Sequence, residues 1–547
     1  MTLLDLPSTG TEQPPAFTTL DQCRIWRKTL PVASPVQAQA QLVRQLHLLD
    51  RYTLSGDQRL ALLEELRETV YLVQGEIAKK FHGKSLPLSP PEQAAYDSTH
   101  ALWQALAAGY LRCIDDCLSV KDSALKLQAA LICQRALVTL LDDLTDRIRA
   151  GCQIEEAHWR LAHKVYAGAE ALARTTTATD DAVRNGKPMS PSAAYVEMML
   201  IAAASLHELS PRQQNWVMDW AHRWAGKVVI HTAPPTAETP ALPLCVDLES
   251  SAPAAFRPQT GKGARWLETS ELRNSMKKRL ALLARGETNL SRLGLGEDCV
   301  LPAAGDLLKR IYPRWVKGGV LRRHERHPLS GACRFVVGVE AIYYYLAGQP
   351  FKGPGAPTAD ELHRQRERLA TFDTVQERIN DEYSRQHGFQ LENWEVMEDW
   401  NLIDQSSGGL RLVRPLKQSG GRLAIGQLIA VQPAGASSLL LGVVRWAQVT
   451  DELLTTGIQL FPGKPQPLAV RGTGVMAARE EWRIGFYLPE VARLETPASI
   501  VLPTGSFKPN RIMEGWHAGD TGEVKLKDVL DRGADFERAT CFSLLHE

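Results

Sequence analysis

The sequence has no long apolar run and no excess of charge of either sign. Its longest apolar candidate, Met198–Leu206, has the size of a buried core segment and is far shorter than the roughly 20 residues that cross a bilayer. We therefore expect no membrane span. With 63 basic and 62 acidic side chains the formal net charge is +1, so no overall field would attract nucleic acid or an anionic membrane.

Secretion signals and a disulfide framework are also missing. The first twenty residues contain Asp5 and no lysine or arginine, unlike the charged start of a signal peptide. Nine cysteines, an odd number in a large chain, fit reduced thiols in the cytoplasm. We expect a cytoplasmic protein, with residues 1–20, rich in Pro, Thr and Gly, as a disordered tail.

No complete set of nucleophile, base and orienting residue is recognisable, so we expect no enzyme, no cofactor and no bound metal. Asp142, Asp143 and Asp146 are spaced D-D-x-x-D, a pattern that can share a magnesium ion. Because a second acidic motif is missing and Arg147 and Arg149 follow at once, we interpret the three as a solvated helix face with local ion pairs. A metal-dependent enzyme that uses these aspartates is the alternative of lowest rank.

The first part of the chain has helical periodicity almost throughout. A length of 547 residues predicts two to four domains. We expect residues 21–231 to form an all-α bundle or short solenoid, with a capping box at Ser55. Such layers more often bind proteins than catalyse reactions. A Pro- and Ala-rich linker over 232–262, with a strand pattern over Leu242–Leu248 inside it, and a small α/β lead-in segment over 263–320 are expected next.

The last part of the chain has short apolar runs separated by Pro, Gly and Ser, which is typical of a small barrel or sandwich. These runs are Gly426–Val431, Leu439–Trp446 and Gly457–Phe461. Three further strand patterns follow Pro462. We expect residues 471–547 to be a β-rich extension, which either continues the barrel or packs as a separate unit.

A motif with recognisable chemistry precedes these runs. Asp404, Ser406 and Gly409, with Gly408 beside the last, are spaced D-x-S-x-x-G between two strand patterns. Adjacent glycines suit a tight turn with positive φ and a close approach of a ligand to the backbone. A carboxylate and a hydroxyl beside bare backbone can accept the N–H donors of a guanine edge. An ordinary hairpin with Asx-turn chemistry is the alternative.

Arginines spaced R-x-x-x-R occur twice before this motif. Arg322 and Arg326 are followed by a strand pattern over Arg334–Val339, whereas Arg364 and Arg368 lie in a helical pattern over 359–386. The second pair is better explained as a solvated helix face. We favour the first pair for anion binding, because a planar guanidinium grips a phosphate with two hydrogen bonds.

Residues 321–470 resemble the PilZ domain family, bacterial receptors for the second messenger cyclic di-GMP. The resemblance rests on the D-x-S-x-x-G turn, on a strand containing Gly442, Val444 and Trp446, and on a G-I-x-L strand that begins at Gly457. It implies that Arg322 and Arg326 hold phosphates and contact guanine, assisted by Arg323. It also implies that Asp404 and Ser406 bind a base edge and that Gly408 and Gly409 keep the turn open.

Between Arg326 and Asp404 the chain is far longer than in that family. We interpret residues 340–390 as a helical insertion, which would pair with its copy in another subunit to form a homo-oligomer. The expected fold is thus α+β and multidomain: an N-terminal all-α domain followed by a PilZ-like small antiparallel β-barrel with a helical insertion. The expected function is a bacterial cyclic di-GMP-binding effector that signals to an unknown protein partner through the helical domain. The alternative is a ligand-free scaffold that acts only through protein contacts.

Overall fold

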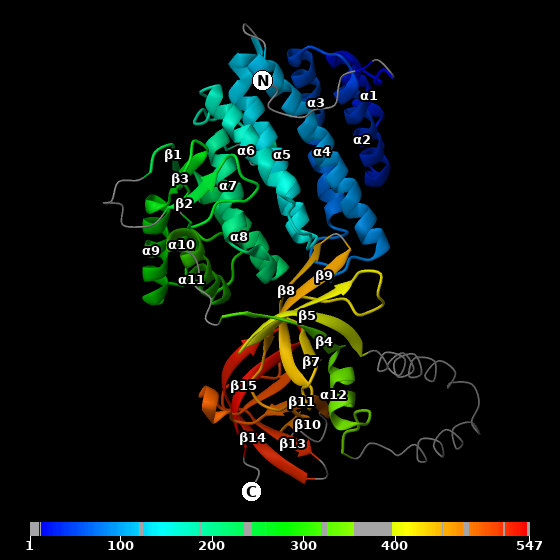
Figure 1. Cartoon of the computed structure of the whole chain (residues 1–547), viewed down its shortest axis with the longest axis vertical. Helices are drawn as coiled ribbons and strands as arrows, with labels where there is room; N and C mark the ends of the chain where they lie inside the picture. Colours follow the sequence, from blue (N-terminus) through cyan, green and yellow to red (C-terminus); the bar gives the residue numbers. More distant parts are fainter. Residues whose placement is uncertain are drawn as a thin grey trace, which may run out of the picture. The chain divides into compact units, whose positions relative to one another are not determined.

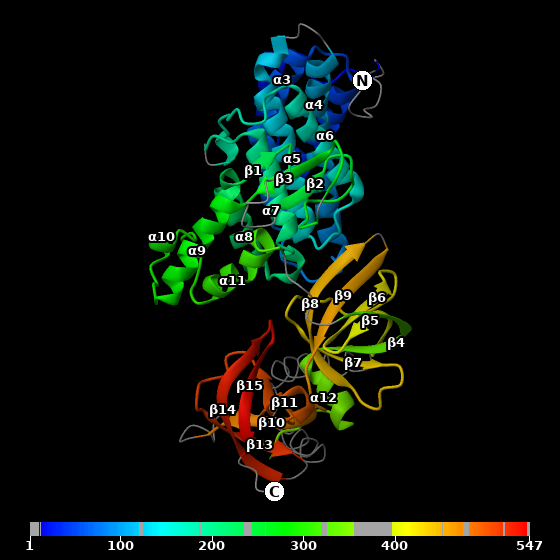
Figure 2. The same ribbon diagram turned by 60° about the vertical axis from the view of Figure 1, so that its left-hand side comes forward.

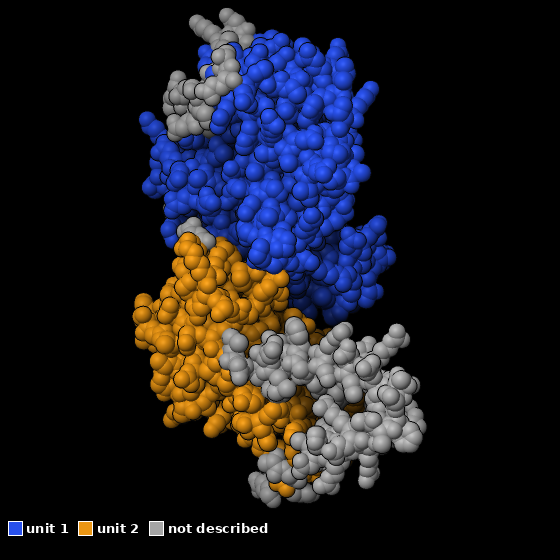
Figure 3. Space-filling view, turned by 90° about the vertical axis from the view of Figure 1, so that its right-hand side faces the viewer, with its two compact units in different colours: residues 1–84, 88–322 blue, residues 85–87, 323–547 orange. Residues whose placement is uncertain are grey.

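The computed structural model forms two compact units, each with its own core. Unit 1 comprises Met1–Lys84 and Leu88–Arg322, and unit 2 comprises Ser85–Pro87 and Arg323–Glu547 (Figure 3). The residues described are 10, 13–119, 124–184, 187–234, 243–257, 259–318, 325–354, 397–450, 452–473, 481–517 and 520–543. Most of the predicted N-terminal tail lies outside them.

Unit 1 begins with the predicted all-helical domain (Figure 1). Its helices are α1 (Leu20–Thr29), α2 (Pro35–Arg51), α3 (Gly56–Ala78), α4 (Pro90–Ser119), α5 (Ala129–Arg149), α6 (Glu156–Ala171), α7 (Pro191–Ala203) and α8 (Pro211–Trp224). The predicted capping box at Ser55 is confirmed: the Ser55 hydroxyl accepts a hydrogen bond from the Gln58 amide, and the Gln58 side chain returns one to Ser55. The local sequence therefore defines where α3 begins.

Helix α5, at the centre of the bundle, packs against α4, α6 and α7. With the turn before it, the segment Ala124–Arg149 is long and apolar enough to cross a membrane, and 72% of its most apolar window is buried inside unit 1. The buried residues surround the helix on all sides, as in the core helix of a globular domain.

The local ion pairs predicted for Asp143 and Asp146 are present, but the interpretation of the three aspartates Asp142, Asp143 and Asp146 as a solvated helix face is wrong, because other helices cover them. Asp143 and Asp146 are buried. The Asp143 carboxylate pairs with Arg147 at 3.2 Å and with His100 of α4 at 2.6 Å, and Asp146 accepts a hydrogen bond from the Trp103 indole. Burial alone would raise the pKa of Asp143, but hydrogen bonds from His100 and His158 and the charge of Arg147 hold it below its usual range.

Asp142 has the opposite balance, because burial raises its pKa to about 6 despite the nearby Arg184 and a hydrogen bond from Tyr71. A folded-state pKa above the unfolded value gives stability that is fully present below about pH 4 and is lost as pH rises through about 6. We expect Asp142→Asn to stabilise unit 1 at pH 8 by about 2 kcal/mol and to have little effect at pH 4.5. Arg184 keeps Glu197 as its partner at 2.7 Å.

Calorimetric melting at the two pH values checks this prediction. Asp97→Asn serves as the control, because Asp97 is exposed on α4. A melting temperature that Asp142→Asn lowers equally at both pH values would contradict the prediction.

The segment after the helices adds a small sheet and three helices to the same core. Strands β1 (Val229–His231), β2 (Leu244–Asp247) and β3 (Ala264–Glu268) form an antiparallel sheet in the order β1-β3-β2. Helices α9 (Ser270–Ala284), α10 (Leu290–Leu293) and α11 (Ala303–Val316) follow. Strand β2 lies within residues 232–262 and confirms the strand predicted inside the linker over Leu242–Leu248. Leu244, Leu267 and Leu308 share one hydrophobic cluster with the helical domain.

Unit 2 contains the predicted small antiparallel barrel. Its strands are β4 (His327–Val337), β5 (Glu398–Ser406), β6 (Gly409–Pro415), β7 (Leu428–Pro433), β8 (Leu440–Thr450) and β9 (Leu453–Leu460). They close in the order β4-β5-β6-β9-β8-β7. Helix α12 (Val339–Ala347) occupies the start of the predicted insertion. Residues 355–396, which hold the rest of it, lie outside the described residues.

The C-terminal extension closes into a second barrel, so the separate unit is the correct alternative. Its strands are β10 (Gln466–Gly472), β11 (Arg483–Leu488), β12 (Ser499–Pro503), β13 (Ile512–His517), β14 (Asp520–Arg532) and β15 (Phe536–Ser543), in the order β10-β11-β12-β15-β14-β13. Leu428 and Phe461 of the first barrel share a hydrophobic cluster with Phe486 and Phe536 of the second. Helix α12 contributes to that cluster and lies beside both barrels (Figure 2).

Candidate functional site

A β-bulge places Asp404 on the outer face of the first barrel. Leu402 pairs with Leu412, and the next pair along β5 and β6 is Asp404 with Arg411, so Ile403 is an extra residue. One extra residue reverses the alternation of side chains along a strand. Leu402 and Leu412 are therefore buried inside the barrel, while Asp404 faces outward beside Arg411, whose side chain is 42% exposed.

A second bulge, on β8, does the same for Trp446. Val444 pairs with Ile458, and Trp446 pairs with Gly457, which leaves Arg445 as the extra residue. Because Arg411 also pairs with Gly457, Asp404, Arg411, Gly457 and Trp446 form one row across four neighbouring strands. We call these four residues the outer row. A Cβ atom at Gly457 would lie 2.0 Å from the Trp446 indole nitrogen, so the ring rests on bare backbone next to Arg411.

Two guanidinium groups hold the Asp404 carboxylate. Arg326 Nη1 lies 2.6 Å from Asp404 Oδ1, although the two residues are 78 positions apart in the chain. Arg411 Nη2 lies 2.7 Å from Oδ2. The Asp404 side chain is only 11% exposed, whereas that of Arg326 is 30% exposed. The carboxylate is thus held firmly, and both cations face solvent on one side.

The other residues of the turn have smaller roles in this structure. The Ser406 hydroxyl lies 3.4 Å from the Gly409 carbonyl oxygen and donates to it, and the Gly408 carbonyl accepts a hydrogen bond from Leu460. The positive φ expected at Gly408 and Gly409 is not found. Glycine is needed at position 409 for another reason: a Cβ atom there would lie 2.5 Å from the Ile458 carbonyl oxygen of β9.

The structure therefore brings Arg326, Asp404, Ser406, Gly408 and Gly409 to one end of β5 and β6. Arg322 and Arg323, and the alternative pair Arg364 and Arg368, lie outside the described residues.

Sequence reasoning did not assign Arg411 and Trp446 to the site. The R-x-x-x-R and D-x-S-x-x-G patterns do not contain them, and the only signal in the sequence was the position of Trp446 in a strand of the PilZ resemblance.

A buried ionic network supports these strands from inside the barrel. Arg414 of β6 and Glu398 of β5 are 1% and 5% exposed, and Arg414 Nε lies 3.4 Å from Glu398 Oε2. The Trp400 indole donates a hydrogen bond to the same carboxylate, and Arg414 also donates to the carbonyl groups of Gln418 and Gly421. The network connects β5 and β6, the two strands that carry Asp404 and Arg411.

Two family models match the chain, one near each end. The N-terminal domain of the cyclic-di-GMP receptor FimW matches residues 21–236, which include helices α1 to α8. The FimW C-terminal beta-barrel domain matches residues 468–541, in the second barrel. Neither description uses the name PilZ, and the barrel with the outer row lies between the two matches. No curated protein matches the chain.

Proposed function

We propose that this protein is a bacterial cyclic di-GMP effector, and that the ligand binds the outer face of the first barrel. Two domain matches to a cyclic-di-GMP receptor support the choice of ligand. The observation that carries the proposed site is the contact of Arg326 with Asp404, since it joins the two distant motifs on one surface. The matched description is that of a receptor and not of an enzyme.

Binding would proceed by an exchange of partners around Asp404. Cyclic di-GMP has two phosphates and two guanine bases. Arg326 would leave Asp404 Oδ1 and grip a phosphate, because a guanidinium binds phosphate through two parallel hydrogen bonds. The freed oxygen would accept N–H donors of guanine, whose amino group marks that base. Arg411 would stay on Oδ2, so the largely buried carboxylate never loses its positive partner.

The remaining residues of the site fit the same ligand. The Trp446 ring, supported on Gly457, offers a flat apolar face for a base to stack on. Arg322, with help from Arg323, would hold the second phosphate. Ser406 would add a hydrogen bond to the base edge, and Gly408 and Gly409 would let the ligand approach the turn.

Ligand binding would hold Arg326 on the phosphate at the barrel surface and so favour one of two arrangements of the protein. The helical domain would then pass the signal to a protein partner in the cytoplasm, and the insertion over 340–390 would support a homo-oligomer.

The test is a calorimetric titration of the whole protein with cyclic di-GMP and with cyclic di-AMP. We expect a micromolar or tighter dissociation constant for cyclic di-GMP. We expect at least about 100-fold weaker binding of cyclic di-AMP, because a site built for hydrogen-bond donors strongly rejects an analogue that lacks them. Equal affinity for the two cyclic dinucleotides would show that Asp404 does not recognise the base. No heat with either ligand would overturn the proposal and favour the ligand-free scaffold.

Trp446 provides a second readout in the same titration. Trp446→Leu should weaken cyclic di-GMP binding by about 10- to 100-fold, since loss of base stacking on an aromatic side chain costs about 1–3 kcal/mol. Trp446→Phe should retain most of the affinity, because it keeps an aromatic face. If both variants bind as the unchanged protein does, the ring is not part of the site.

A further inference from the structure

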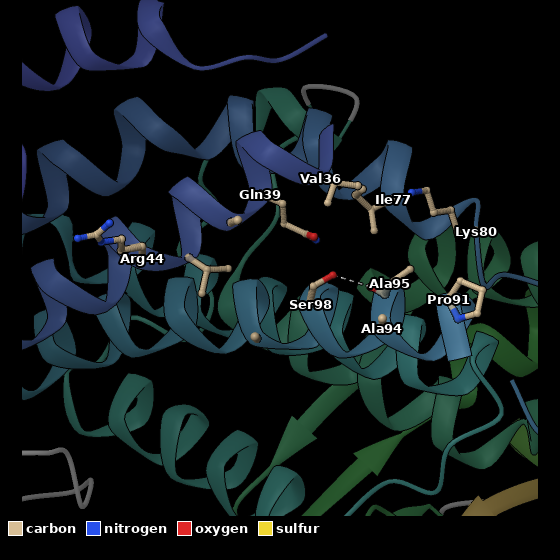
Figure 4. Close-up of a pocket in the computed structure, with 12 residues that line it drawn as sticks. Val36, Gln39, Arg44, Ile77, Lys80, Pro91, Ala94, Ala95 and Ser98 are labelled. Carbon is tan, nitrogen blue, oxygen red and sulfur yellow. Dashed lines mark hydrogen bonds between the residues drawn. The ribbon is translucent and has the colours of Figure 1, made fainter. Parts of the chain in front are cut away.

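A groove of about 600 Å³ lies in unit 1 between α2 and α4, with the end of α3 beside it (Figure 4). Helix α2 lines it with Val36, Gln39, Ala40, Val43 and Arg44, and α4 lines it with Pro91, Ala94, Ala95, Ser98 and Ala101. Both sets follow the spacing of residues on one face of a helix. The groove is therefore a seam along which the two helices leave their facing sides partly uncovered.

Most of the side chains that line this groove are small and apolar. Four of the ten residues from α2 and α4 are alanines, and Val36 is 53% exposed. Small side chains leave room for a body as wide as another helix to lie between α2 and α4, as in the helix-in-groove mode of peptide recognition.

A buried polar group points into the groove. Gln39 is only 2% exposed, and its Nε2 donates to Gln74 Oε1 at 2.8 Å and to Thr99 Oγ1 at 3.4 Å. These two bonds fix the amide, and the Oε1 atom, which forms no hydrogen bond with the described residues and is not completely buried, is open to the groove. Figure 4 shows the side chain extending from α2 into the space above Ser98. An occupant with a hydrogen-bond donor at this point would pair with this open oxygen.

Two cations mark the ends of the groove. Arg44 and Lys80 lie at opposite ends (Figure 4). Neither forms an ion pair within the described part of the chain, and the lining contains no acidic residue. A complementary occupant would carry negative charge at both ends.

We propose that the groove binds an amphipathic helix of a partner protein, with an acidic residue near each end and a hydrogen-bond donor in its apolar face. Along α2 the lining extends over eight residue steps, from Val36 to Arg44. At about 1.5 Å per residue this is a length of about 12 Å. A partner segment of two to three turns has that length. A long-chain fatty acid fits less well, because it has one anionic end and no donor along its chain.

The test uses the whole protein, a labelled helical peptide and fluorescence anisotropy, and involves no nucleotide, so its outcome is independent of the proposed function of unit 2. The peptide has an Ala/Leu face with a central Gln and a Glu near each end; its twin carries Lys in place of Glu. We expect the acidic peptide to bind at least about tenfold more tightly than its twin. Arg44→Glu with Lys80→Glu should reverse that preference.

Two further variants separate the groove from general charge effects. Lys28→Glu changes an exposed cation on α1 and should leave both affinities unchanged. Ala94→Trp should abolish binding of the acidic peptide without a change of charge, because the indole fills the groove. Absence of binding by either peptide, or the same affinity for both, would overturn the proposal. Displacement of the acidic peptide by dodecanoate, without any effect of Arg44→Glu and Lys80→Glu, would assign the groove to an acyl chain and also overturn it.

Discussion

Replacing Arg326 by alanine should weaken cyclic di-GMP binding by about 30-fold or more, with the fold unchanged. Truncating one member of a hydrogen-bonded charge pair at an interface costs about 2–5 kcal/mol, and each 1.4 kcal/mol is about tenfold in affinity. Folding should persist, because Asp404 keeps Arg411 at 2.7 Å as a partner and the Arg326 side chain is already 30% exposed. Calorimetric titration measures the loss.

Arg334→Ala is the matched control for Arg326→Ala. Arg334 lies on the same strand, β4, and is exposed, and it pairs with Asp399 in the sheet register, far along the strand from Asp404. Its replacement removes the same charge from the same barrel. We expect affinity within about twofold of the unchanged protein, since an exposed charge away from the ligand contributes little once it is screened by salt. If the two variants lose affinity equally, net charge and not the contact with Asp404 governs binding.

Replacing Glu398 by alanine should destabilise the first barrel by about 3–5 kcal/mol, the cost of leaving a buried charge without its partner. Arg414 is 1% exposed and lies 3.4 Å from Glu398. In the Glu398→Ala variant the Arg414 guanidinium would face the Trp400 ring, which lies 5.3 Å away. The Trp400 indole would also lose its hydrogen-bond acceptor. Replacing both residues, Glu398→Leu with Arg414→Met, should recover most of the loss, because an apolar pair can substitute for a buried ion pair.

Hydrogen exchange of peptides from β5 and β6 measures this effect without assuming that the whole chain unfolds in one step. The surface pair Lys417–Glu452, with side chains 82% and 74% exposed, is the control in the same barrel. Glu452→Ala should change the protection by no more than about 1 kcal/mol, as exposed ion pairs contribute little. Similar protection in Glu398→Ala and Glu452→Ala would show that the buried network does not stabilise the barrel.

The patterns that could be read in the sequence were local ones. Helical periodicity with the capping residues at Ser55 predicted the bundle, and short apolar runs between turns predicted small barrels. Arg326 and Asp404 were correctly expected to meet, because the order of the two motifs in the PilZ resemblance holds although the segment between them is much longer. Their role in ligand binding stays a prediction.

Misreadings arose where a neighbour distant in sequence decided the environment. Asp143 and Asp146 looked solvated because Arg147 and Arg149 follow them, yet His100 and Trp103 of α4 cover them. Gly409 looked like a turn glycine, yet its missing side chain makes room for the Ile458 carbonyl of β9. In both cases the residues nearby in the sequence do not reveal which distant element packs against the position.

By itself, the sequence determined the kinds of element, their order and the presence of a guanine- and phosphate-compatible set of side chains, since these depend on residues close together in the chain. Only the tertiary structure decided which face of the barrel each side chain occupies. The reason is that a single extra residue, Ile403 on β5 or Arg445 on β8, reverses the alternation of a strand. That reversal, which depends on pairing with neighbouring strands, puts Asp404 and Trp446 beside Arg411 on one surface.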